Sequence, residues 1–267
     1  SGNRVSNTFL NGIYLGDVPR ITYSHNIVGN IGNIGLYSTS STHENGRHVT
    51  CIGNQVASCV DEGIRLDRLN TLIVEGNSVQ NCGTGTASAG ITAIGQSPGG
   101  MVTMSGNQIR QVGGSGLSAS AGNVGNKYIF TDNITDNTVT YGIFCAVGNC
   151  VMSVQGNHIA NVSGSSRGIY VPANSAGQIV GNWVDPLTVT TPLFHSAGGG
   201  SGDGYQSIGL NSFNATQGYG TVAPSIGIWR KNDIIWNTNA AASGNIGFVC
   251  TVAGSPGTWK NFGPIGA

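Results

Sequence analysis

The sequence predicts an all-β protein: a right-handed parallel β-helix of about seven to eight coils, followed by a small antiparallel β module. Three observations predict this fold. An asparagine recurs with a β-branched residue two places later, a glycine-aliphatic step follows in each coil, and the composition changes near residue 208. We therefore expect a β-helix over 1–184, a linker or chain crossing over 185–207, and a C-terminal module over 208–267.

The first repeat is an asparagine that usually follows glycine. These asparagines are Asn3, Asn26, Asn54, Asn77, Asn107, Asn137, Asn157 and Asn182. Two residues later stand Val5, Val28, Val56, Val79, Ile109, Val139, Ile159 and Val184. Three residues before the asparagine stand Tyr23, Cys51, Val74, Met104, Ile134, Val154 and Ile179, and four residues after it stand Asn7, Asn30, Ser58, Asn81, Gln111, Tyr141 and Asn161. Because stacked coils lie about 4.8 Å apart, the asparagines are expected to form a structural ladder at a corner.

The second repeat is a glycine followed by isoleucine or leucine. It occurs at Gly12-Ile13, Gly35-Leu36, Gly63-Ile64, Gly90-Ile91, Gly116-Leu117, Gly142-Ile143 and Gly168-Ile169. Glycine, asparagine and β-branched residues are poor helix formers, which favours strands over a helical solenoid. The residue after each marker should then point outward.

These outward positions predict the composition of one sheet face. The first set is Tyr14, Tyr37, Arg65, Thr92, Ser118, Phe144 and Tyr170, and the second is Gly16, Thr39, Asp67, Ile94, Ser120, Ala146 and Pro172. We expect an aromatic, arginine and aspartate stripe at the N-terminal end of this face.

The composition excludes several classes of protein. Of the 267 residues only 8% are charged, the formal net charge is zero, and 39% are hydrophobic. A disordered chain is excluded, and no basic patch suggests nucleic acid as a partner. No apolar run is long enough for membrane insertion. The six cysteines have no metal-ligand spacing, so we expect buried thiols, no metal and no cofactor. Since Ser1 opens directly into the repeat, we expect a piece of a longer protein.

The C-terminal segment carries a more specific pattern. It reads Trp-x-x-x-Asp-Ile-x-x-Asn from Trp229, then Gly-Phe-Val-Cys-Thr from Gly247, then Gly-x-Pro-Gly-Thr-Trp from Gly254. This pattern resembles a short module at the ends of β-helical phage tailspikes and related bacterial proteins of the pectate-lyase-like superfamily. The resemblance implies a parallel homotrimer in a virion tail that binds or degrades a bacterial surface polysaccharide. Because fold does not fix chemistry, these are expectations by analogy.

Candidate chemistry concentrates in one charged segment. Five of the eleven acidic residues fall between 44 and 75, and 61–68 is the densest charged run. Polysaccharide cleavage needs an acid and a base. The candidate catalytic residues are Glu62, Asp67 and Asp61, and the candidate substrate-binding residues are Arg65, Tyr14 and Tyr37. The alternative interpretation of this segment is a surface ion pair between Arg65 and Asp67 beside a solvated turn.

Three functions remain open. The first is a phage tailspike fragment that recognises a capsule, exopolysaccharide or lipopolysaccharide, with or without depolymerising it as a glycoside hydrolase or polysaccharide lyase. The second is a non-catalytic structural or receptor-binding tail tip, which the scarcity of acidic residues favours. The third is a free-standing, secreted bacterial lyase, hydrolase or epimerase. The motifs of polygalacturonases and pectate lyases are absent from the sequence, so no catalytic residue follows from them.

Overall fold

The computed structural model divides the chain into two compact units, 1–211 and 212–267. Its described residues are 1–40, 47–68, 70–83, 88–94, 98–120, 125–146, 150–164, 167–171, 176–185, 191–195, 204–209, 212–213, 217–225, 231–254 and 256–266.

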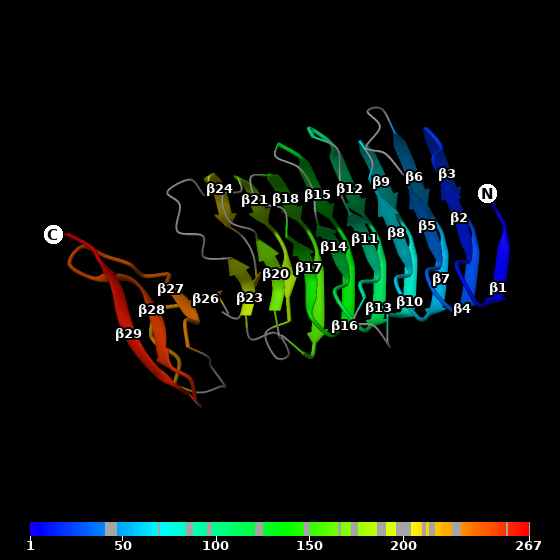
Figure 1. The fold of residues 1–267 in the computed structure, drawn as a ribbon. Helices are drawn as coiled ribbons and strands as arrows, with labels where there is room; N and C mark the ends of the chain where they lie inside the picture. Colours follow the sequence, from blue (N-terminus) through cyan, green and yellow to red (C-terminus); the bar gives the residue numbers. More distant parts are fainter. Residues whose placement is uncertain are drawn as a thin grey trace. The chain divides into compact units, whose positions relative to one another are not determined.

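The first unit is a solenoid in which successive strands of each parallel sheet come from successive coils (Figure 1). The first sheet contains β1 (Arg4–Thr8), β4 (Ile27–Ile31), β7 (Gln55–Cys59), β10 (Ser78–Cys82), β13 (Gln108–Val112), β16 (Ile134–Thr138), β19 (His158–Val162) and β22 (Trp183–Val184). The second contains β2 (Ile13–Gly16), β5 (Leu36–Thr39), β8 (Ile64–Asp67), β11 (Ile91–Ile94), β14 (Leu117–Ser120), β17 (Tyr141–Cys145), β20 (Arg167–Val171) and β23 (Thr191–His195). The third contains β3 (Arg20–Ser24), β6 (His48–Ile52), β9 (Thr71–Glu75), β12 (Met101–Ser105), β15 (Lys127–Thr131), β18 (Val151–Gln155), β21 (Ala176–Val180) and β24 (Gly204–Gly209). This architecture confirms the predicted fold class.

Aliphatic columns fill the interior, as the repeats predict. The second-sheet column Leu36, Ile64, Ile91, Leu117, Ile143 and Ile169 is fully buried. All six cysteines are buried with free thiols. Since burial of apolar surface is the main favourable term in folding, these columns hold the coils together.

The marker positions need glycine because atoms of the next coil lie where a Cβ would stand. A Cβ added at Gly116 would lie 2.5 Å from Cγ2 of Thr135 and 2.8 Å from the carbonyl oxygen of Gly142. Contacts of the same kind surround Gly12, Gly35, Gly63, Gly90 and Gly142. The two repeats are therefore coupled, because the residue two places after the ladder asparagine packs where a marker side chain would stand.

The asparagine ladder is continuous but shifts in one coil. Its members are Asn3, Asn26, Asn54, Asn77, Asn107, Asn133, Asn157 and Asn182. The assignment of Asn137 to the ladder was wrong. In this coil Asp132 takes the place of glycine with a φ of 54°, and Asn133 follows it.

The same shift moves the neighbouring positions. Thr135, not Val139, pairs with Ile109 and Ile159, and Val139 is 40% exposed. Phe130, not Ile134, is the buried residue three positions before the ladder asparagine. Asn137, not Tyr141, is the corner residue four positions after it. That corner column is left-handed throughout, with φ between 50° and 58° at Asn7, Asn30, Ser58, Asn81, Gln111, Asn137 and Asn161. Its polar character therefore has a conformational cause, since Asn tolerates this region better than most residues.

The segment 185–207, expected as a linker or crossing, contains β23 and the first residues of β24, which continue the second and third sheets. The second unit begins with β25 (Ser212–Phe213). Its sheet has the order β26 (Gln217–Gly220), β27 (Ile234–Asn237), β28 (Asn245–Val252) and β29 (Thr258–Pro264). The pairs β27–β28 and β28–β29 are antiparallel as predicted, whereas β26 and β27 are parallel. Trp229, Glu44 and His43 lie outside the described residues.

Candidate functional site

The predicted substrate-binding residues form one outward column on the second sheet. Tyr14 pairs in register with Tyr37, and Tyr37 pairs with Arg65. The two tyrosine rings lie 5.3 Å apart between centroids, and Cζ of Arg65 lies 5.7 Å from the Tyr37 ring centroid. We call these three residues the first platform, because ring faces backed by a cation suit the flat apolar faces of sugars.

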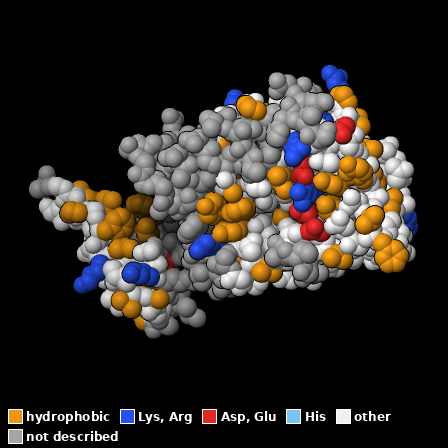
Figure 2. Space-filling model, in the orientation of Figure 1, with side chains coloured by type: hydrophobic (Ala, Val, Ile, Leu, Met, Phe, Trp, Pro, Cys, Tyr) orange, Lys and Arg blue, Asp and Glu red, His pale blue; other side chains and the backbone are white. Residues whose placement is uncertain are grey.

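Two candidate catalytic carboxylates lie against the guanidinium of Arg65. Its Nε donates to Oδ2 of Asp67 at 3.0 Å and to Oδ1 at 3.3 Å, and its Nη1 lies 3.5 Å from Oε1 of Glu62. The Tyr37 hydroxyl donates to Oδ2 of Asp67 at 3.5 Å. In Figure 2, side chains of both charges gather in one stripe with apolar side chains on either side. Five of the six predicted residues are thus brought together in one connected cluster.

Glu62 differs from an ordinary surface carboxylate. It is 7% exposed, and its Oε2 is buried without a hydrogen-bond partner. Burial, together with the negative charge of Asp61, raises the pKa of Glu62 to about 7, although its own backbone hydrogen bond and Arg65 act in the opposite direction. Asp61, the sixth predicted residue, accepts a hydrogen bond from the Ser88 hydroxyl and acts on the cluster through Glu62. A carboxyl poised near neutral pH suits a general acid.

Asp67 is also buried, and its environment is more polar. Burial raises the pKa of Asp67, while Arg65 and the Tyr37 hydroxyl oppose the rise by stabilising the charged form. Asp67 therefore has stronger support for its negative charge than Glu62 has. Two carboxyls with different environments on one arginine can divide the roles of acid and base.

A groove of about 310 Å³ begins at Glu62 and crosses the outer face of the second sheet. It is lined by Glu62, Ala89, Thr92, Ile94, Ser115, Ser118, Ser120, Thr140, Tyr141 and Phe144. Its floor on β11 and β14 consists mostly of small side chains, so the sheet is hollowed between bulkier neighbours. The groove therefore places the side chain of Glu62 beside a space that a ligand can occupy.

A second aromatic cluster stands at the far end of the groove, which the sequence analysis missed. The rings of Tyr141 and Phe144 lie 4.9 Å apart, and Phe144 and Tyr170 are also 4.9 Å apart. Nη1 of Arg167 donates to the Tyr141 hydroxyl at 3.0 Å, and Cζ of Arg167 lies 5.9 Å from that ring. We call these four residues the second platform. Phe144 and Tyr170 belong to the predicted outward set. Two consecutive rings at the C-terminal end of that set could have predicted the second platform.

Other kinds of site find no support in the part of the chain that the structure describes. It contains no group of three or more His, Cys, Asp or Glu placed to hold a metal ion. Over the same residues we find no helix with the length and apolar character needed to cross a bilayer.

Comparison with known proteins supports the fold. Residues 1–129 match the family model described as right handed beta helix region. No curated protein matches the sequence. Among solved structures, tailspike protein 3 of bacteriophage CBA120 is similar in fold, with a TM-score of 0.55 and 13% identity over 99% of this chain. The chain spans 43% of the length of that tailspike. The protein is therefore a right-handed parallel β-helix protein whose fold is similar to that of a phage tailspike.

Proposed function

We propose that this chain binds a bacterial surface polysaccharide, such as a capsule, exopolysaccharide or lipopolysaccharide, along the groove of the second sheet. The observation that carries the proposal is the pair of aromatic-arginine platforms on one sheet face: Tyr141 and Phe144 of the second platform line the groove, and Arg65 of the first is the register partner of the lining residue Thr92. Four strand steps separate Tyr37 on β5 from Phe144 on β17, which is about 19 Å at the spacing of paired strands. A site of this length suits a chain of several sugars that crosses the strands, with rings stacked at both ends and hydroxyl groups over the floor.

Ring removal tests the proposal. We expect Tyr37→Ala and Phe144→Ala each to weaken binding by about tenfold, because each loses one stacking surface. The measurement is calorimetric titration with purified capsule, exopolysaccharide and lipopolysaccharide O-chain. Trp183→Ala removes a part-exposed ring from the first sheet and should leave the affinity unchanged. Equal affinity for all variants, or no binding of any of these polysaccharides by the native chain, would reject the proposed site.

The same proposal includes assembly as a homotrimer in a virion tail, as the resemblance to tailspikes implies. Light scattering on the purified chain is expected to give a mass three times the 27.3 kDa of one chain. A monomeric mass at high concentration would contradict the trimer while leaving the groove untouched.

A second candidate function, cleavage of the bound polysaccharide, is favoured by the environment of Glu62. The side chain of Glu62 lines the groove, its buried Oε2 has no hydrogen-bond partner, and Asp67 supplies a second carboxyl on the same arginine. In this proposal Glu62 protonates the leaving oxygen, Asp67 acts as base or nucleophile, and Arg65 holds the pair in place. A non-catalytic receptor-binding tail tip would show the binding without the cleavage.

A further inference from the structure

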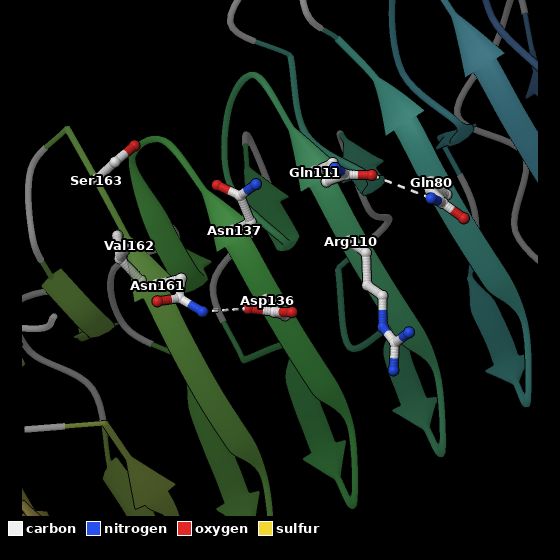
Figure 3. A pocket seen from close by; sticks show the side chains of 8 residues that line it. All are labelled: Gln80, Arg110, Gln111, Asp136, Asn137, Asn161, Val162 and Ser163. Atoms are coloured by element: carbon white, nitrogen blue, oxygen red, sulfur yellow. Dashed lines mark hydrogen bonds between the residues drawn. The ribbon is translucent and has the colours of Figure 1, made fainter. Parts of the chain in front are cut away.

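A second hollow, of about 770 Å³, lies on the outer side of the first sheet, over β10, β13, β16 and β19 (Figure 3). It is lined by Gln80, Arg110, Gln111, Asp136, Asn137, Asn161, Val162 and Ser163. We call it the polar hollow. Its lining comes from a different sheet than the groove, and no residue is shared between the two.

Part of this lining is explained by the fold. Gln111, Asn137 and Asn161 belong to the left-handed corner column, where the backbone itself favours such side chains. Three of the other polar residues, Gln80, Arg110 and Asp136, stand one position earlier. The members of their column are Ser6, Gly29, Ala57, Gln80, Arg110, Asp136 and Ala160. Long polar side chains occur there in three consecutive coils, with small residues on both sides. Neither backbone conformation nor packing requires them at these outward strand positions.

The two charged residues of the polar hollow, Arg110 and Asp136, do not form an ion pair with each other. Arg110 and Asp136 are register partners on neighbouring strands, yet no ion pair joins them and Arg110 makes no hydrogen bond to any described residue. Nδ2 of Asn161 donates to Oδ1 of Asp136 at 2.7 Å, and Nε2 of Gln80 donates to Oε1 of Gln111 at 3.0 Å. Figure 3 shows both bonds along the lining. Each bond orients an amide or carboxylate, and the Gln80 and Gln111 amides and the Asp136 carboxylate can each form further hydrogen bonds with a ligand.

The lining restricts the class of ligand. One arginine and one aspartate cancel in charge, so neither a polyanion nor a cation is favoured. Val162 is the one apolar side chain in the described lining, so an apolar ligand would gain little from burial. The remaining chemistry is a dense set of directional donors and acceptors, which matches a neutral molecule with many hydroxyl groups. We propose that the polar hollow is a second carbohydrate site, which binds a neutral saccharide through its hydroxyl groups.

This site would differ from the groove in mode of recognition. The described lining contains no aromatic ring, so the saccharide would be held by its edges and not by stacking. Affinity would be low, and the configuration of individual hydroxyl groups would decide it, because unmatched polar groups are costly. The inference does not depend on the proposed function of the groove.

Saturation-transfer NMR with defined neutral oligosaccharides of glucose, galactose, mannose and N-acetylglucosamine tests the inference. We expect at least one of them to bind the native chain and the double variant Arg110→Ala/Asp136→Ala to bind it at least about tenfold more weakly, since hydrogen bonds to charged groups are lost. If the double variant unfolds, Gln80→Ala, a substitution at an exposed position, provides a second test of oligosaccharide binding. Gln55→Ala, exposed on the same sheet and outside the hollow, is the matched control.

The groove variant Phe144→Ala separates the two sites. Binding of the neutral oligosaccharide should survive Phe144→Ala, whereas binding of the surface polysaccharide should be weakened. If the oligosaccharide signal is lost with Phe144→Ala and retained in the hollow variants, the polar hollow is not a site. Absence of binding to every oligosaccharide tested also overturns the inference. The first of these results would place the oligosaccharide in the groove, whereas the second leaves the proposal for the groove unaffected.

Discussion

Replacing Asn133 with alanine is expected to lower the free energy of unfolding by about 3 kcal/mol, because the substitution leaves several buried polar groups without partners. Asn133 donates from its backbone nitrogen and from Nδ2 to Oδ1 of Asn157, and Nδ2 also donates to the carbonyl oxygen of Met104 at 2.8 Å. Its own Oδ1 accepts from the backbone nitrogen and Nδ2 of Asn107. Alanine removes every bond of the side chain, and the site is fully buried, so water cannot replace them.

The matched control is Asn137→Gly, four residues further along the chain. Asn137 is exposed, has a φ of 54°, and stands outside the ladder, so glycine should change the free energy of unfolding by less than about 1 kcal/mol. Urea denaturation of both variants, followed by circular dichroism, measures the difference. A larger loss with Asn137→Gly than with Asn133→Ala would contradict the ladder described above.

This pair of residues also shows how far the repeat can be predicted from sequence. Ladder and marker positions repeat because stacked coils impose the same contacts on each, so seven of the eight ladder asparagines were placed correctly. The error arose where Asp132 adopts the left-handed conformation that glycine adopts in most other coils. Two asparagines then follow within five residues, and only the register of neighbouring strands decides between them.

The candidate site was predictable in part for the same reason. The alternation of strand residues placed Tyr14, Tyr37 and Arg65 on one face, and their stacking follows from in-register parallel pairing. The groove was not predictable, because its lining combines side chains from four consecutive coils. The burial of Glu62 has the same origin, since Glu62 precedes β8 and its environment comes from neighbouring coils.

Glu62→Gln is expected to stabilise the protein at pH 8 by about 2 kcal/mol and to leave its stability at pH 4 unchanged. At pH 4 the carboxyl, whose ordinary pKa is 4.5, is largely protonated in the unfolded chain and fully protonated in the folded one. Between pH 4.5 and 7 the unfolded chain ionises first, so stability falls as the pH rises through the folded pKa of about 7. Glutamine has no proton to lose. The attraction of Arg65 is already contained in the folded pKa, and the expected gain is below the full value of the shift because Arg65 is part-exposed and solvent screens the cluster.

Thermal unfolding of both proteins at the two pH values measures this effect, with Glu75→Gln, an exposed carboxyl on β9, as the matched control.

If the chain cleaves its polysaccharide, the same Glu62→Gln substitution should reduce the rate by at least about 100-fold, because the general acid is lost. Cleavage by the native chain should then decline above pH 7, as Glu62 loses its proton. Added stability together with lost cleavage would mark Glu62 as a carboxyl kept for function at the expense of stability. Unchanged stability at pH 8 would instead show that the carboxyl is solvated and ionised, which would remove the physical basis for its role as an acid.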